Sequence, residues 1–194
     1  MRYTVLKGSP RKNGNTNALL APFLDELSKN GAEFDIFDLY DLKIDGCHAC
    51  LGCQKDKTVP GCVIQDDMQP ILKATLESDA IIVASPIYAW YCTAPTKAVL
   101  DRYIYAYCKF YGDDPHGPIL WKGKKLFILT TCGYPVEKGA DVFEDGMKRY
   151  CKHCGIVYGG MLAERQRNLK EAFMDAEKED HARAFAKQVM ELTK

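Results

Sequence analysis

The chain of 194 residues has the length of one domain, and 47% hydrophobic with 27% charged residues is the composition of an ordinary globular protein. Its 26 basic and 26 acidic residues balance to a formal charge of zero, so no long-range field favours nucleic acid or anionic lipid. No apolar stretch approaches the roughly 20 residues that span a bilayer, and no apolar signal core follows Met1. We therefore expect a cytoplasmic protein that binds neither nucleic acid nor membranes.

The amino-terminal segment predicts a βαβ unit. Residues 3–6 are a short β-prone run, and residues 8–17 form a loop rich in Gly, Ser, Pro and Asn. Apolar residues then recur at helical spacing over 19–27, where Pro22 indicates either a late start or a kink of the helix. Residues 33–38 alternate in polarity and predict the second strand.

Strands and helices continue to alternate along the rest of the chain. We expect a helix at 68–76, a strand at 80–84, a helix at 96–107, a strand at 125–131, a helix at 140–154, a strand at 156–161 and a closing helix that ends near Leu192. This order predicts one α/β domain over residues 1–194, a doubly wound parallel sheet of five strands. A cysteine-rich loop is inserted at about 39–66.

The loop after the first strand, GSPRKNGNT at residues 8–16, predicts a phosphate site. Backbone N–H groups and the positive end of the helix dipole converge where such a loop enters a helix. The loop lacks the Gly-Lys-Ser/Thr of a nucleotide triphosphate loop and the Gly-x-Gly-x-x-Gly of a dinucleotide site. The alternative is a tight turn with a helix cap, which we favour for Lys12 and Asn17. The side chains that suit a monophosphate are Ser9, Arg11, Asn13, Asn15 and Thr16.

Three segments resemble the flavodoxin-like NAD(P)H-dependent FMN reductases, and within them the iron-sulfur flavoproteins. They are GSPRKNGNT, then ASPIYAWYCTAPTKAVLDR at 84–102, and TTCGYP at 130–135. The resemblance implies a flavodoxin-like sheet with strand order 2-1-3-4-5, FMN as cofactor, and NAD(P)H as hydride donor. It also implies a small-molecule electron acceptor and a homodimer or homotetramer.

The resemblance further implies which residues contact the cofactor. Ser9, Arg11, Asn13, Asn15 and Thr16 would hold the FMN phosphate. Pro86, Ile87, Tyr88, Ala89 and Trp90 would line the isoalloxazine ring, and the backbone at Thr131, Cys132 and Gly133 would touch its other end. For Trp90 and Tyr91, ordinary core packing is the competing interpretation. No catalytic side chain is expected, because the flavin itself carries the redox chemistry.

Nine cysteines, an odd number without an export signal, indicate thiols or metal ligands and not a disulfide framework. Cys47, Cys50, Cys53 and Cys62 form a compact run like those that bind a [4Fe–4S] cluster, and a similar run holds a cluster in the iron-sulfur flavoproteins. Zinc, with His48 as a possible fourth ligand, and free thiols are the alternatives. We expect the other five to be small buried hydrophobes: Cys92, Cys108, Cys132, Cys151 and Cys154.

Two other functions remain open from the sequence. The protein could carry electrons through FMN and a cluster without using NAD(P)H, or it could be a metal- or redox-sensing module built on the cysteine loop. We also expect Asp101 and Arg102 to form a structural ion pair. The aromatic residues between Tyr103 and Tyr111 suggest a contact between subunits.

Overall fold

The strands form where β-branched and other apolar residues are concentrated, and the helices form between them at amphipathic segments. The computed structural model describes residues 1–113, 115–168 and 170–194. The strands are β1 Arg2–Lys7, β2 Glu33–Asp38, β3 Ala80–Pro86, β4 Lys125–Cys132 and β5 Val157–Arg165. The helices are α1 Asn15–Lys29, α2 Met68–Glu77, α3 Ala94–Tyr107, α4 Val136–Gly139, α5 Asp141–His153 and α6 Ala176–Thr193, with a short 3-10 helix, η1, at Gly52–Gln54.

All paired strands are parallel, and their order across the sheet is β2-β1-β3-β4-β5. This is the expected flavodoxin-like fold. The chain first moves outward from β1 to β2, then crosses back to β3 on the other side of β1. The carboxyl ends of β1 and β3 therefore feed loops to opposite faces, and the crevice between these loops is where open α/β sheets bind ligands.

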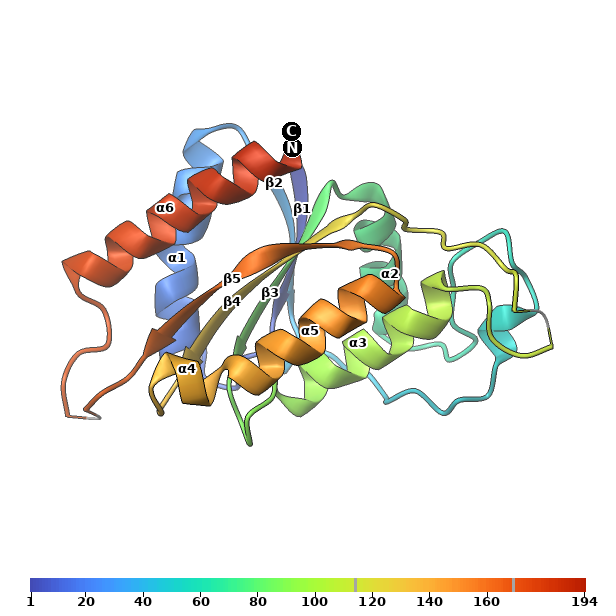
Figure 1. The fold of residues 1–194 in the computed structure, drawn as a ribbon, viewed down its shortest axis with the longest axis horizontal. Coiled ribbons are helices and arrows are strands. Elements are labelled where there is room, and N and C mark those ends of the chain that lie inside the picture. The colour runs from blue at the N-terminus through green and yellow to red at the C-terminus, as the bar shows by residue number, and fades with distance from the viewer. Residues whose placement is uncertain (114, 169) are drawn as a thin grey trace.

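Two helical layers cover the sheet (Figure 1). On one face, Val5, Ile82 and Leu129 pack with the apolar sides of α1 and α6. On the other, Ile81 and Ile128 pack with α2, α3 and α5. Side chains of successive strand residues point to opposite faces, so the continuous apolar run of β3 supplies both cores.

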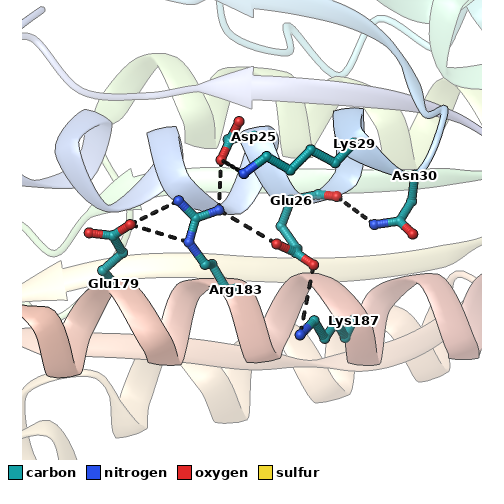
Figure 2. A network of polar contacts seen from close by, with 7 residues as sticks. All are labelled: Asp25, Glu26, Lys29, Asn30, Glu179, Arg183 and Lys187. Carbon is teal, nitrogen blue, oxygen red and sulfur yellow. Dashed lines mark hydrogen bonds and ion pairs between the residues drawn. The ribbon is translucent and has the colours of Figure 1, made fainter.

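The α1–α6 layer is closed at its surface by an ion-pair network (Figure 2). The guanidinium of Arg183 on α6 lies 2.6 Å from Asp25, 2.8 Å from Glu179 and 3.5 Å from Glu26. Lys187 lies 3.8 Å from Glu26. The network joins the first helix of the chain to the last.

Several element boundaries differ from the sequence expectation. Helix α1 begins at Asn15 and Pro22 lies inside it, so of the two alternatives predicted from this proline the late start is excluded. Residues 136–139 form the separate short helix α4 before α5, and β5 extends to Arg165. A carboxylate oxygen of Asp66 accepts a hydrogen bond from the Met68 N–H at 3.1 Å and so caps α2.

The inserted segment at 39–66 contains η1 and otherwise irregular backbone. It runs from the carboxyl edge of the sheet to the far end of α3, where η1 contacts that helix (Figure 1). In the ranges that the structure describes, none of the helices combines the length and apolar character that a bilayer crossing requires.

Candidate functional site

The loops that follow β1, β3 and β4 meet at the carboxyl edge of the sheet. The Gly8 N–H donates to the Ala84 carbonyl at 2.7 Å, and the Thr93 hydroxyl donates to the Gly8 carbonyl at 2.7 Å. The hydroxyls of Thr16 and Thr131 are hydrogen-bonded to each other at 2.8 Å and are buried. The structure thus brings together segments that are more than 100 residues apart in the sequence.

Gly8 is required where the first loop crosses the start of α3. A Cβ placed on Gly8 would lie 1.9 Å from Thr96 Oγ1 and 3.0 Å from Thr93 Oγ1, well inside van der Waals contact. Only glycine lets the loop backbone approach the β3–α3 connection this closely.

The first loop presents free hydrogen-bond donors at its junction with α1. No side chain caps the amino end of this helix, and no acidic residue lies in its first turn. The Ser9 hydroxyl is buried and is bonded to the Arg11 backbone, which shapes the turn. The Arg11 side chain folds against Gly14, since a Cβ there would lie 3.3 Å from Arg11 Nε. A helix amino end with free N–H groups, a hydroxyl and a guanidinium is suited to an anion.

The asparagines of this loop have different surroundings. Asn13 is exposed. The Asn15 amide donates to Gln166 Oε1 at 3.0 Å, and the Gln166 N–H donates to the Cys132 carbonyl at 2.9 Å. Asn17 donates to two carbonyls of its own loop, in line with the structural role expected of it. Gln166 was not identified from the sequence; its only signal is its position directly after the last strand.

The loop after β3 makes a tight two-residue turn. Tyr88 and Tyr91 exchange backbone hydrogen bonds of 2.8 and 3.0 Å, while Ala89 and Trp90 have φ angles of 49° and 62°. Residues other than glycine adopt this left-handed conformation at a cost of about 1–2 kcal/mol each. Strained backbone that the surrounding structure nevertheless maintains is typical of ligand sites.

Aromatic side chains stand exposed beside this turn. Trp90 is 48% exposed and Tyr134 is 61% exposed, and their rings stack with centroids 5.8 Å apart. The Trp90 indole N–H donates to the Lys138 carbonyl at 3.1 Å, which fixes the ring. Tyr91 instead packs edge-on against Phe143 in the core. Trp90 is therefore accessible to a ligand, and Tyr91 has a packing role.

The remaining predicted residues of the flavin site lie close to the same turn. Pro86 and Ile87 are half-buried at the end of β3, where the Ile87 N–H donates to the Thr131 carbonyl at 2.9 Å. Cys132 is buried and its thiol donates to the Tyr134 carbonyl at 3.3 Å, while Gly133 is exposed. All thirteen residues predicted to contact FMN thus lie on the three converging loops, at the carboxyl ends of β3 and β4, or on the first turn of α1.

The four cysteines of the inserted segment, Cys47, Cys50, Cys53 and Cys62, line one small pocket. Arg102 and Tyr105 of α3 form its inner wall. Backbone strain marks the loop here as well, since Ala49 and Leu51 have φ angles of 51° and 53°. Residues separated by up to fifteen positions in sequence therefore converge on one pocket.

Buried polar groups anchor this cysteine loop to α3. The Gln54 amide donates to the carbonyls of Tyr105 at 2.7 Å and Cys108 at 3.1 Å. The Lys109 ammonium donates to the Cys53 carbonyl at 2.7 Å. Burial raises the pKa of the Cys53 thiol and lowers the pKa of Lys109.

Comparison with known proteins assigns the chain to a family. Residues 1–147 match the family described as NADPH-dependent FMN reductase. The chain belongs to the NADPH-dependent FMN reductase family. It is 34% identical over 160 residues to an iron-sulfur flavoprotein of Archaeoglobus fulgidus, a match that covers 81% of this chain and 65% of the relative. It is 35% identical over 102 residues to an iron-sulfur flavoprotein of Methanocaldococcus jannaschii, covering 53% of this chain and 51% of the relative.

Solved structures share the fold at low sequence identity. The NAD(P)H:quinone oxidoreductase of Methanothermobacter marburgensis superposes with a TM-score of 0.72 at 17% identity, over 97% of this chain and 94% of that one. RosB, solved with 8-demethyl-8-formylriboflavin-5'-phosphate, gives 0.73 at 16% identity, over 100% of this chain and 79% of that one. These structures show the shared fold, and iron-sulfur flavoproteins are among the relatives in sequence.

The donor set of the first loop fits the phosphate of FMN, the cofactor named by the family. Uncapped helical N–H groups, the Ser9 hydroxyl and the Arg11 guanidinium are all hydrogen-bond donors. Among the described residues, no carboxylate forms an ion pair with Arg11, so its charge is available to an anion. The strained turn and the exposed rings of Trp90 and Tyr134 provide flat apolar surface nearby.

The four thiols of the cysteine pocket are the ligand type of a [4Fe–4S] cluster, and their arrangement does not suit a single zinc ion. Around one Zn²⁺, with Zn–S distances of about 2.3 Å, four sulfur atoms lie within about 4 Å of each other. In the described part of the chain, no three Cys, His, Asp or Glu side chains are arranged to hold a single metal ion. In a [4Fe–4S] cluster each thiolate binds a different iron, so the sulfurs are farther apart. The pocket encloses about 20 Å³, so a cluster requires the exposed part of the loop to move outward.

One sequence expectation near these sites is wrong. Asp101 and Arg102 do not pair with each other: Asp101 pairs with Lys97 at 2.5 Å on the surface of α3, and Arg102 pairs with Asp66 at 2.5 Å in the interior. The cause is helix geometry, because consecutive residues point in different directions.

The aromatic run predicted to form a subunit contact is divided by the fold. Tyr103 and Tyr107 are fully buried against Trp121 and belong to the core. Tyr105, Phe110 and Tyr111 are half-buried, and a contact between subunits at these three residues stays a prediction.

The other five cysteines are buried, as expected. Burial raises the pKa of the Cys92 and Cys151 thiols to about 12, so these remain protonated and unreactive at neutral pH. His153, between Cys151 and Cys154 in sequence, is hydrogen-bonded through Nε2 to the Tyr111 hydroxyl at 2.6 Å. These residues are therefore packing elements and not a second metal site.

Proposed function

We propose that this protein is an FMN-dependent oxidoreductase that takes hydride from NADH or NADPH and passes electrons to a small-molecule acceptor. The observation that carries the proposal is the meeting of three loops at the carboxyl edge of β1, β3 and β4, with the uncapped amino end of α1 in their midst. Membership of the NADPH-dependent FMN reductase family supports the cofactor.

The phosphate end of the cofactor would bind at the first loop. Backbone N–H groups at the start of α1 point toward the site, Ser9 and Thr16 supply hydroxyls, and Arg11 neutralises charge. Asn13 and Asn15 complete the polar surface, with Asn15 held by Gln166. The first loop would thus bind the phosphate and orient the cofactor.

The ring end would lie along the strained turn at 86–90. Trp90 and Tyr88 present exposed apolar faces, and the backbone at 86–90 and 131–133 would face the polar edge of an isoalloxazine. FMN, when bound, accepts a hydride and releases electrons singly or in pairs. The protein supplies position and partial exclusion of water, and no side chain is required as an acid or base.

An open groove beside this site offers room for a second molecule. It runs along the carboxyl ends of β4 and β5 from Pro135 to Lys178, and Arg165 and Arg167 are among its lining residues. The lining also holds six carboxylates, Glu137, Glu144, Glu164, Glu171, Asp175 and Glu177, so only the end at Arg165 and Arg167 suits the phosphates of a nicotinamide nucleotide. We propose that NAD(P)H approaches the flavin at this basic end of the groove.

Anaerobic reduction tests the proposal. Protein reconstituted with FMN is mixed with NADH or NADPH, and loss of the oxidised flavin absorbance is followed. We expect reduction by at least one of the two nucleotides. Arg11→Ala should weaken FMN binding about tenfold, since a charge-assisted hydrogen bond contributes about 1.5–3 kcal/mol. Lys12→Ala is the matched control, because Lys12 belongs to the same loop but its charge is paired with Asp41 at 2.6 Å. Flavin that binds but is reduced only by ferredoxin would instead support an electron carrier.

A second candidate function follows from the cysteine pocket. We propose that Cys47, Cys50, Cys53 and Cys62 bind a [4Fe–4S] cluster, which supplies one-electron transfer when present. The lining of one pocket by all four thiols supports this, as do the iron-sulfur flavoproteins among the relatives. Anaerobic reconstitution with iron and sulfide should give about four of each per chain. Zinc in place of iron would favour the sensor interpretation, and neither metal would indicate free thiols.

A further inference from the structure

Two cations lie buried against the cysteine pocket. The Arg102 side chain is 0% exposed and forms part of the pocket wall. Lys109 is likewise 0% exposed and lies behind Cys53, whose carbonyl accepts its hydrogen bond. Full burial of Lys and Arg is rare because desolvating a cation is costly unless an anion or several hydrogen bonds compensate for it.

The partners of these cations account for only part of that cost. Arg102 pairs with Asp66 at 2.5 Å and donates weakly to the Asp45 and Ile64 carbonyls at 3.3 Å. Its Nε–H is buried and has no acceptor. Within the ranges that the structure describes, no carboxylate lies within ion-pairing distance of Lys109. One buried ammonium, on which Asp56 acts without forming an ion pair, and one buried N–H donor without an acceptor thus lie beside the four thiols.

We propose that Arg102 and Lys109 form a cationic support for the cysteine pocket. The two cations favour an anionic thiolate-bound cluster and raise the reduction potential of that cluster. The inference rests on the proposed binding of a [4Fe–4S] cluster by the four cysteines. A cluster held by four thiolates is negatively charged and gains a further negative charge when it accepts an electron. A nearby cation therefore stabilises the reduced form more than the oxidised form.

The two residues act in different ways. Lys109 supplies positive charge, because Asp56, whose charge acts to raise the pKa of the ammonium, forms no ion pair with it. Arg102 forms a neutral pair with Asp66, so its contribution is the unsatisfied Nε–H, a donor available to a ligand sulfur or to the cluster. Hydrogen bonds to cluster sulfurs and net charge are both known determinants of cluster potential. Both residues act through the ligands, so they are positioning residues and not catalytic ones.

The test is a redox titration of the reconstituted protein, with dithionite as electron donor and the spin signal of the reduced cluster as readout. At the midpoint potential of the wild type, Lys109→Met should lower the ratio of reduced to oxidised cluster about tenfold, equivalent to about 59 mV for one electron. Lys109→Arg, which keeps the charge, should restore the wild-type ratio. Arg102→Lys keeps the pair with Asp66 but lacks the Nε–H, and should lower the ratio about threefold.

Lys97→Met is the matched control. It removes one positive charge from the same helix, but from an exposed side chain paired with Asp101, and should leave the ratio unchanged. FMN binding reports whether each variant is folded. A Lys109→Met protein that binds FMN but not the cluster, while Lys109→Arg binds both, also supports the proposal.

Other outcomes overturn it. Unchanged ratios in Lys109→Met and Arg102→Lys would show that the cations have no influence on the cluster. Loss of the cluster from both Lys109 variants, with FMN retained, would show that packing and not charge matters at this position. A wild-type protein that binds FMN but takes up no iron would refute the cluster and this inference together, and would leave the flavin function intact.

Discussion

The close approach of the first loop to the start of α3 depends on Gly8. In Gly8→Ala the new methyl group would lie 1.9 Å from Thr96 Oγ1, so the loop must move away from the β3–α3 connection. We expect a loss of stability of about 1–3 kcal/mol from the overpacking. FMN affinity should fall as well, because the loop carries the phosphate donors. Urea unfolding and fluorescence titration with FMN measure the two effects.

Gly46→Ala serves as the control for this variant. No heavy atom lies within 4 Å of a Cβ at Gly46, and its φ is not in the left-handed region, so both stability and FMN affinity should stay near wild type. If Gly8→Ala proves as stable and as tight-binding as Gly46→Ala, the first loop does not depend on the contact with Thr96.

Single residues of the site could be predicted where their chemical type is informative by itself. Ser9 and Arg11 stand out because a hydroxyl and a guanidinium between a strand and a helix suit a phosphate. Gln166 could not be predicted, since its hydrogen bond to Asn15 spans 151 residues and has no sequence signature. The same holds for Arg102, whose partner Asp66 depends on how the inserted loop folds back.

At the scale of elements, the attachment of α6 to α1 depends on Arg183 (Figure 2). Its hydrogen bonds with Asp25 and Glu179 raise its own pKa further, and the bonds that Asp25 accepts from Lys29 and Arg183 lower the pKa of that carboxyl. Arg183→Met should lower the melting temperature, because the change leaves carboxylates of both helices without this partner. This decrease in melting temperature should be smaller in high salt, because salt screens exposed charges.

The control for Arg183→Met is Lys73→Met, which removes an exposed cation whose pair with Glu77 is long, at 3.9 Å. Its melting temperature should equal that of the wild type. An equal effect of the two substitutions, or a loss that does not depend on salt, would contradict an electrostatic role of the α1–α6 network.

The contact between β5 and α6 should depend on pH. His181 Nδ1 lies 2.8 Å from Glu164 Oε1, and this hydrogen bond raises the pKa of the imidazole above its usual 6.5. Because the folded state binds the proton more tightly, the stabilisation is complete below pH 6.5 and is lost as the pH rises through the raised pKa. Urea unfolding at about pH 6 and about pH 8.5 should show a larger stability difference for wild type than for His181→Gln. Identical pH dependence in the two proteins would rule out this link.

Elements were predictable where the apolar pattern of the sequence is regular, and the alternating strand β2 was predicted at 33–38 although none of its residues is buried. The β3 run is apolar at every position because both its faces are covered, and its position was predicted to within two residues. Pro22 left the start of α1 undecided, and the helix runs through it because packing of Leu19, Leu20 and Phe23 in the core outweighs one missing backbone hydrogen bond. The conformation of 39–66 could not be predicted, since tertiary contacts with α3 hold it in place of regular hydrogen bonding.

At the scale of the whole molecule, the two candidate redox sites lie at opposite ends of α3. The strained turn precedes Ala94 and the cysteine pocket includes Tyr105, so roughly 16 Å of helix separates them. Substitutions this far apart act independently in most proteins. Cys50→Ala with Cys53→Ala should therefore abolish iron binding and leave FMN affinity within about twofold of wild type.

Metal analysis measures the iron content of this double variant, and titration with FMN measures its FMN affinity. Cys92→Ala is the control, because it removes a buried packing thiol at the flavin end of α3. If the loop variant loses FMN along with iron, the two sites are coupled and the cysteine loop is part of the flavin site. Retention of iron by the variant would refute these residues as ligands.

The central claim is that the loop at residues 8–16 holds the phosphate of a flavin mononucleotide, and equilibrium binding of FMN compared with riboflavin tests it most directly. The two ligands share the ring system and differ by the phosphate. With at least two charge-assisted hydrogen bonds of about 1.5–3 kcal/mol each, riboflavin should bind more than about 100-fold more weakly than FMN. Equal affinity for the two ligands, or no measurable binding of FMN, would contradict the account.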